Sequence, residues 1–179
     1  MLTRAEIEDG REYAAAALAS AGIVITAGER AGLEVSDFGL GILESIGLQV
    51  LVYVNTDRVC AKELVLRPGQ VCPEHRHVGE GAELGKEETF RVRTGEVWLY
   101  VDGPAAAHPR ATPVRRGHFT VWHELVLRPG DQHTIMPGTR HWFQAGPEGA
   151  IVTEFSTRST DERDVFTDPD IRRITIVAD

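Results

Sequence analysis

Three histidines in the chain have the spacing of a metal site. His75 and His77 are two positions apart, and residues i and i+2 of an extended strand point to the same face, so their imidazoles could bind one ion. His141 follows the turn signal 137–138, which would return another strand to the same end of a β-structure. Neutral imidazole is a common ligand of transition metals, so this pattern predicts a metal centre.

A carboxylate is the expected fourth ligand. Glu88 begins a run in which Phe90 and Val92 would share its face, which indicates a buried carboxylate. A buried carboxylate needs a partner, and a cation is a good one. Three imidazoles and one carboxylate suit Mn, Fe, Zn, Co or Ni better than Mg or Ca. On an octahedral ion, four protein ligands leave two positions open for substrate oxygens.

The segments that must position these residues are predicted to be short strands. Apolar, β-rich runs alternate with Gly and Pro signals, and Thr94-Gly95 between two of them indicates a hairpin-like turn. The runs are 49–55, 59–67, 88–93, 96–102, 119–128, 133–136, 141–145, 150–156 and 174–177. Such a series predicts an all-β sandwich or barrel.

The first part of the chain is expected to be helical. Thr3 and Glu6 have capping-box spacing ahead of an Ala-, Glu- and Leu-rich stretch, 4–21, which Gly22 can end. A second, shorter helical piece is expected near Ala27, followed by a Gly-punctuated segment, 38–47. We therefore expect one domain over residues 1–179, in which 1–47 pack on a β-barrel formed by 48–179.

Composition excludes several partners. The 179 residues carry a net charge of −8, which argues against nucleic acid and, weakly, against anionic membranes. The two cysteines, Cys60 and Cys72, form no C-x-x-C pair. There is no apolar signal core at the start and no run near the roughly 18 apolar residues that span a bilayer. We expect a cytoplasmic protein without nucleic-acid or membrane partners.

The residues around the ligands resemble the two cupin motifs. Gly69-x5-His75-x-His77 with Glu88-x6-Gly95 resembles the first motif, and Pro137-Gly138-x2-His141 resembles the second. The resemblance implies a jelly-roll barrel with these four metal ligands. Two departures are a longer loop between His77 and Glu88 and a second motif that is one residue short. Glu87 competes for the carboxylate position, but the spacing to Gly95 favours Glu88.

Longer stretches resemble the D-lyxose ketol-isomerase family of sugar isomerases. They are 54–64, 72–77, 85–90, 141–146 and 153–157, within a resemblance that covers about 23–171. The resemblance implies isomerisation of an unphosphorylated sugar, D-lyxose to D-xylulose and also D-mannose to D-fructose. Our mechanistic hypothesis is proton transfer through a cis-enediol that a divalent ion stabilises, with a hydride shift as the alternative. We take Mn²⁺ as the expected ion, with Zn, Fe, Co and Ni as alternatives, and a homodimer as a plausible assembly.

Moving a proton between C1 and C2 of a sugar requires a general base. Glu154 is the candidate because it lies in an apolar run, 150–155, and the family resemblance points to the same residue. The alternative is a surface residue on an edge strand, and alternation along the run does not decide between the two. Lys86, in the loop before Glu88, could bind a sugar hydroxyl or move a proton between O1 and O2; the alternative is a solvated lysine.

Three further residues are candidates for substrate binding. Lys62 shares a strand face with Leu64 and would point inward, or else reach the barrel mouth. Trp142 could stack on a sugar, although a tryptophan beside a ligand is more often core, and Gln144 could orient the substrate. The stretch 161–164 is expected to form a polar turn with a substrate role as one option.

A cupin metal site by itself does not name a reaction. The alternatives are an Fe(II)-dependent dioxygenase and a sugar-binding cupin without catalysis. A phosphosugar isomerase would need basic residues at the mouth. Arg91 and Arg93 should face away from the metal if Glu88 faces it, which counts against a phosphate.

Overall fold

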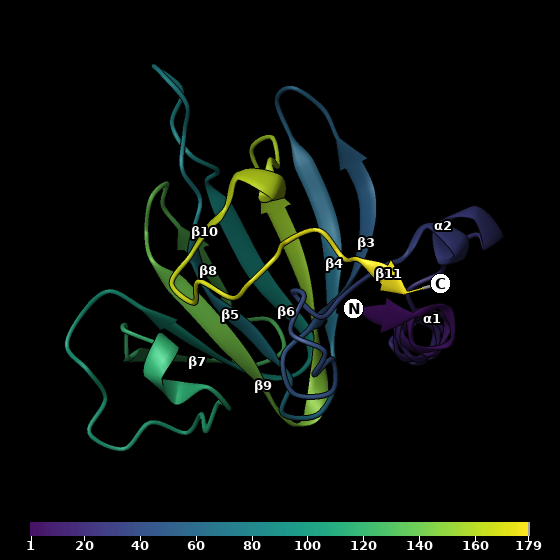
Figure 1. The fold of residues 1–179 in the computed structure, drawn as a ribbon, viewed down its shortest axis with the longest axis horizontal. Coiled ribbons are helices and arrows are strands. Elements are labelled where there is room, and N and C mark those ends of the chain that lie inside the picture. The colour runs from purple at the N-terminus through teal and green to yellow at the C-terminus, as the bar shows by residue number, and fades with distance from the viewer. Residues whose placement is uncertain (179) are drawn as a thin grey trace.

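Nine strands within residues 1–178, the part of the chain described by this computed structural model, form one curled sheet (Figure 1). They are β2 (Glu34–Ser36), β3 (Leu48–Asn55), β4 (Cys60–Leu66), β5 (Val71–Arg76), β6 (Glu88–Val101), β7 (His123–Leu127), β8 (Gln132–Ile135), β9 (His141–Ser156) and β10 (Val165–Phe166). The main path runs β10-β5-β9-β4-β3-β2, and β6 pairs with β7, β8 and β9. The predicted all-β barrel class with N-terminal helices is confirmed.

The two longest strands are continuous where the sequence predicted pairs of shorter ones. β6 and β9 are antiparallel along most of their length, and the register shifts between Val92 and Thr94 and again between Gly95 and Val97. The predicted hairpin at Thr94-Gly95 is therefore wrong. Gly95 has a φ of 74°, and this backbone, unfavourable for other residues, lets the strand bulge and bend instead of turning back.

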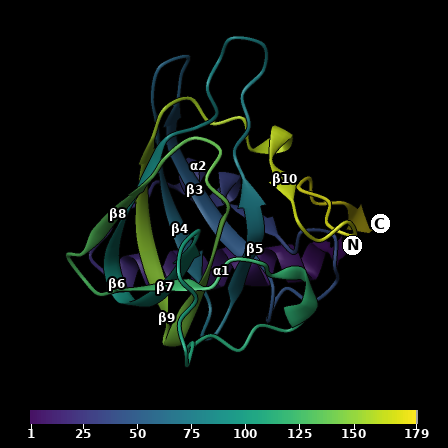
Figure 2. The same cartoon turned by 90° about the vertical axis from the view of Figure 1, so that its left-hand side faces the viewer.

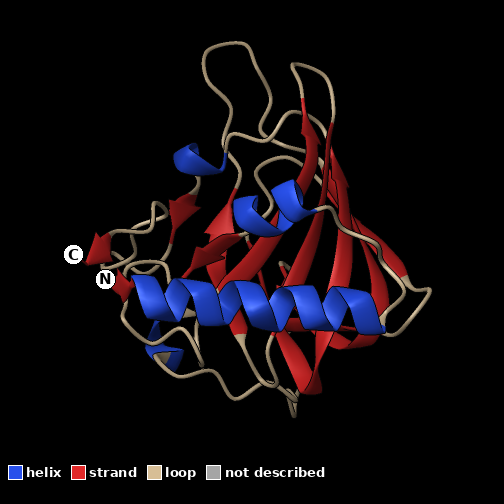
Figure 3. Cartoon of the chain, turned by 90° about the vertical axis from the view of Figure 1, so that its right-hand side faces the viewer, coloured by secondary structure: helices blue, strands red, loops and turns tan. Residues whose placement is uncertain are grey.

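The helices pack on the outer face of the sheet (Figure 3). They are α1 (Arg4–Ser20) and α2 (Ala27–Gly32). Thr3 caps α1 through the predicted capping box with Glu6, because each residue bonds the other's backbone N–H. Ala14 and Leu18 of α1 lie against a small apolar cluster on the outside of β3, β4 and β9, while most of the apolar core fills the barrel interior.

The chain after β9 forms a C-terminal strap, residues 157–178, which lies at one side of the curled sheet next to β5 (Figure 2). It contains a 3₁₀ turn (Asp161–Arg163), β10, and β11 (Val177–Ala178), which pairs in parallel with β1 (Leu2–Thr3). Arg115, from the loop before a second 3₁₀ turn (Arg116–His118), bonds Asp168 of the strap at 2.6 Å. None of the helices within residues 1–178 is long and apolar enough to cross a membrane.

Candidate metal centre and substrate cavity

The four predicted ligands meet inside the barrel although they come from three strands. His75 lies on β5 and His77 follows it, Glu88 is the first residue of β6, and His141 is the first of β9. Their ligand atoms all lie within 4.8 Å of one another, and all four residues are buried. Glu88 Oε1 is 3.0 Å from Nε2 of both His77 and His141. The group could hold a metal ion.

Hydrogen bonds at the rear of each imidazole leave Nε2 facing the centre. His75 Nδ1 donates to Pro73 O at 2.8 Å, and His141 Nδ1 donates to Thr139 O at 3.0 Å. A carbonyl oxygen can only accept, so Nδ1 carries the hydrogen in both rings. The Nε2 lone pairs are then free for a cation, as in most histidine metal sites.

The electrostatics of the site fit a cation. Within residues 1–178, His141 Nε2 is buried without a hydrogen-bond partner, although Glu88 Oε1 lies 3.0 Å away. Burial and the neighbouring imidazoles hold the pKa of His75 well below its usual range, so this ring is neutral. Burial would lower the pKa of His77 as well, yet the Glu88 carboxylate raises it to about 9. A proton is thus attracted to the place a metal would take.

A small cavity that is partly open to solvent lies beside this group. Its polar lining, besides the ligands, combines three cations with three carboxylates, and aromatic and aliphatic side chains form the rest. The polar residues are Lys62, Lys86, Glu154, Asp161, Asp164 and Arg173. The cavity therefore presents charged groups of both signs next to the metal ligands.

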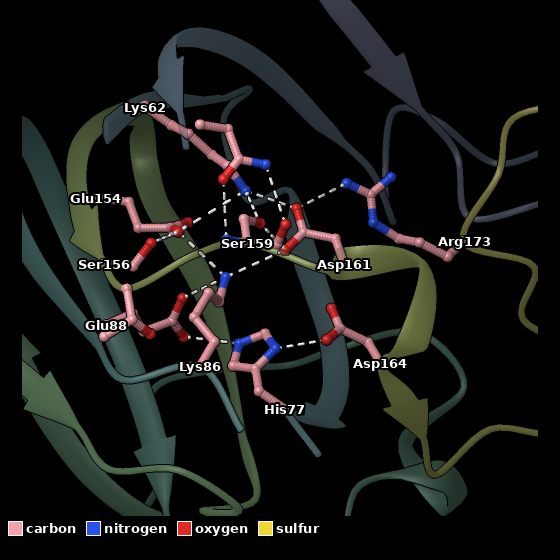
Figure 4. A network of polar contacts seen from close by, with 12 residues as sticks. Lys62, His77, Lys86, Glu88, Glu154, Ser156, Ser159, Asp161, Asp164 and Arg173 are labelled. Carbon is pink, nitrogen blue, oxygen red and sulfur yellow. Dashed lines mark hydrogen bonds and ion pairs between the residues drawn. The ribbon is translucent and has the colours of Figure 1, made fainter. Parts of the chain in front are cut away.

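Lys86 is a buried cation between the metal group and the cavity (Figure 4). Its Nζ lies 2.8 Å from Glu88 Oε2, 3.1 Å from Glu154 Oε1 and 3.2 Å from Asp161 Oδ1. Burial would lower the pKa of Lys86, but these carboxylates, Glu154 above all, hold it well above the usual range. Lys86 is therefore charged and is not a solvated loop lysine.

Glu154 faces the barrel interior. It lies opposite Lys62 on β4 and Phe90 on β6, and both of these residues line the cavity. Its Oε1 accepts a hydrogen bond from Ser156 Oγ at 3.0 Å, in addition to the one from Lys86. The carboxylate is only 3% exposed, which rules out the alternative of a surface residue.

Lys62 points into the same cavity. Its Nζ bonds Asp161 Oδ2 at 2.6 Å and Ser159 Oγ at 2.7 Å, and it lies 3.8 Å from Glu154 Oε1. Burial would lower the pKa of Lys62, but Glu154 and Asp161 raise it, so this lysine is charged too. It does not snorkel out to solvent at the barrel mouth.

The strap adds residues that sequence reasoning missed or only touched. Asp161 accepts from both lysines and from Arg173, at 3.3 Å, and Asp164 accepts from His77 Nδ1 at 2.5 Å (Figure 4). The acidic stretch 161–164 was a visible signal for the two aspartates. Ser159 and Arg173 had no local signal, because only the fold of the strap brings them to the cavity.

Trp142 and Gln144 do not reach the cavity. Alternation along β9 directs them away from the side of His141 and Phe143. Trp142 stacks on Tyr100 with ring centroids 4.1 Å apart, and Gln144 bonds Gly69 O at 2.7 Å. As a correction to the sequence prediction, we leave both residues out of the proposed substrate-binding set.

Solved structures with the same fold include L-ribose isomerases. The enzyme of Cellulomonas parahominis matches with a TM-score of 0.82 at 18% identity, over 99% of this chain and 98% of its own. That of Geodermatophilus obscurus matches with a TM-score of 0.73 at 17% identity, over 94% and 88%. Fold and buried His/Glu group together define the class: an all-β barrel with a group that could bind a metal ion.

Relatives with similar sequences show to which family the chain belongs. A D-lyxose ketol-isomerase of Thermofilum sp. (strain ex4484_79) is 57% identical over 176 residues, which are 97% of this chain and 98% of the relative. A D-lyxose/D-mannose isomerase of Thermosediminibacter oceani is 55% identical over the full length of both chains. No family model matches the chain. The chain belongs to the D-lyxose ketol-isomerase family and is an aldose–ketose isomerase.

Proposed function

We propose that the chain interconverts D-lyxose and D-xylulose, and also D-mannose and D-fructose, with one divalent ion on His75, His77, Glu88 and His141. The observation that carries the proposal is the position of Lys86 and Glu154, two buried residues that line one cavity with His75, His77 and Glu88. The relatives' names supply the sugars. Mn²⁺ is the ion we propose, and cytoplasmic location and a homodimer stay predictions.

Glu154 is the proposed base. A divalent ion on the four ligands supplies Lewis acidity that stabilises negative charge on the sugar oxygens. Glu154 takes the proton from C2 of the open-chain aldose, a cis-enediol forms, and the same carboxylate returns the proton to C1. The buried carboxylate lines the same cavity as the metal ligands, which is where the sugar would have to lie.

Lys86 is the proposed group that transfers a proton between the sugar oxygens O2 and O1. Isomerisation moves a second proton, from O2 of the aldose to O1, while the C–H proton moves from C2 to C1. A charged Nζ that already bridges Glu88 and Glu154 can donate to O1 and then take the proton from O2. Lys62, on the far side of Glu154, would bind a more distant hydroxyl.

The charges favour a sugar without phosphate. Lys62, Lys86 and Arg173 are each paired with carboxylates. Arg91 and Arg93 are exposed, as alternation with Glu88 predicted. The dioxygenase and the non-catalytic cupin are set aside, because the chain belongs to a family of isomerases.

The first test is turnover on lyxose, mannose, xylulose and fructose by metal-stripped protein before and after Mn²⁺ is added. We expect no turnover without metal and restored turnover of lyxose and mannose with it. Deuterium from solvent should appear at C2 or C1 of the recovered sugars, since the proton passes through Glu154. A protein with bound Mn²⁺ that turns over none of the four would contradict the proposal.

The second test is Glu154→Gln, with Glu63→Gln as the matched control. Glu63 is a buried carboxylate that accepts from Thr153 Oγ1 on the opposite face of the same strands. Glu154→Gln should lower kcat by about 10²- to 10⁴-fold, the usual contribution of a general base, while Mn²⁺ affinity stays unchanged. Glu63→Gln should keep its activity. A full-rate Glu154→Gln protein would remove Glu154 from the mechanism.

A further inference from the structure

The three histidines of the metal group are oriented by hydrogen bonds from Nδ1, and the acceptors are of two different kinds. His75 and His141 each donate Nδ1 to the carbonyl of the residue two positions earlier, so their own turns orient them. His77 instead donates Nδ1 to the carboxylate of Asp164, 87 positions later in the chain. One ligand therefore depends on a distant segment for its orientation.

Strand pairing explains how Asp164 reaches His77. β10 runs antiparallel to β5, with Val165 opposite Arg76 and Phe166 opposite His75. The same register continued by one residue sets Asp164 opposite His77. Phe166 covers the ring of His75, with ring centroids 5.4 Å apart. The two alternate side chains of the strap thus support the two histidines of the H-x-H pair.

The side chain of Asp164 makes its hydrogen bond with His77. Its side chain is 7% exposed, and within residues 1–178 its hydrogen-bond partner is His77 Nδ1. The strap is anchored independently: Thr167 N donates to Glu74 O at 3.1 Å, and Arg115 Nε donates to Asp168 at 2.6 Å. A change at Asp164 can therefore alter His77 without releasing the strap.

We propose that Asp164 is a positioning residue for the metal centre, through which the C-terminal strap sets metal affinity. Its carboxylate holds the hydrogen of His77 on Nδ1 and keeps Nε2 aimed at the ion, as an outer carboxylate does for metal-bound histidines. The inference rests on the proposed metal site. It adds that the site is complete only when β10 is docked against β5.

The test is Mn²⁺ titration by calorimetry on the metal-stripped full chain, for the wild type and three variants. Asp164→Ala removes the acceptor, Asp164→Asn keeps an acceptor oxygen without its charge, and Asp168→Asn is the matched change at a strap anchor. Asp164→Ala should weaken Mn²⁺ binding by about 10- to 100-fold, the usual effect of losing an outer partner. Asp164→Asn should weaken it less, and Asp168→Asn should bind as the wild type does.

Visible spectra of the Co²⁺-loaded proteins provide a second readout, because they report the ligand geometry. Asp164→Ala and Asp164→Asn should shift the Co²⁺ bands, and Asp168→Asn should not. An unchanged Mn²⁺ affinity and Co²⁺ spectrum in a folded Asp164→Ala protein would overturn the inference. If Asp164→Ala does not fold, an unchanged affinity and spectrum in Asp164→Asn would overturn it. An equal loss of Mn²⁺ affinity in Asp168→Asn would also contradict it, because Asp164 would then act only by holding the strap in place. A wild type that binds no Mn²⁺ would instead contradict the proposed function.

Discussion

Lys86 and Lys62 show how single buried residues prepare the cavity for chemistry. Both ammonium groups are held in their charged form by Glu154 and Asp161, against a burial that would lower their pKa values. Only Lys86 also contacts a metal ligand, Glu88, at 2.8 Å. The two lysines should therefore contribute to different steps, Lys86 to proton transfer and Lys62 to binding.

This difference gives a prediction for paired variants. Lys86→Met should lower kcat by about 10²-fold or more, since it removes the group that serves O1 and O2. Lys62→Met should mainly raise KM, because it removes a contact to a distant hydroxyl. Steady-state kinetics on lyxose separates the two effects, with circular dichroism to check folding, since an unpaired buried carboxylate costs about 3–5 kcal/mol. Equal kcat values for both variants would contradict the assignment.

At the scale of elements, the bulged strand β6 curves the sheet around the site. Gly95 sits at this bulge with a φ of 74°, and a Cβ there would lie 2.0 Å from Gly149 O of β9. The bend joins the half of β6 that begins with Glu88 to the half that packs in the far end of the barrel. No other residue type fits the bend without moving β9.

Gly95→Ala should therefore destabilise the protein, by at least the roughly 1–3 kcal/mol of a strained left-handed residue. The measurement is the midpoint of urea unfolding at a constant slope. Gly117→Ala is the matched control, because a Cβ there meets nothing within 4 Å and its φ is not positive. A Gly95→Ala protein as stable as Gly117→Ala would show that β6 can relax without the bulge.

At the scale of the whole molecule, the metal group ties together distant parts of the chain. β5, β6 and β9 each supply ligands, and the strap closes the cavity over them. The unfolded chain cannot assemble these four residues at one point. A metal that binds them should therefore stabilise the native state by mass action.

Removing the metal should lower the melting temperature. With free Mn²⁺ at about 100 times its Kd the stabilisation is about 2.7 kcal/mol, which corresponds to roughly 5–10 °C for a chain of this size. Differential scanning calorimetry of stripped and Mn²⁺-loaded protein checks this. His141→Ala should abolish most of the shift, and an undiminished shift in that variant would place the stabilising ion elsewhere.

Local patterns in the sequence were sufficient to predict the ligand group, the first helix cap and the β-class of this protein. The H-x-H pair, the carboxylate at the start of a strand and the late histidine predict the ligand group, because alternation on a strand is a local property. The capping box of Thr3 and Glu6 is equally local. The strand runs predict the β-class, since each depends on side chains within a few residues.

The other features of the fold and the site were decided only by the tertiary structure, because they depend on contacts between distant segments of the chain. β9 is buried on both faces near Trp142 and near Glu154, so its apolar pattern could not tell which side faces the cavity. The two halves of β6 read as separate strands, since only the packing of Gly95 against β9 reveals a bulge. Ser159 and Arg173 join the site only through the docking of the strap, which no local spacing encodes.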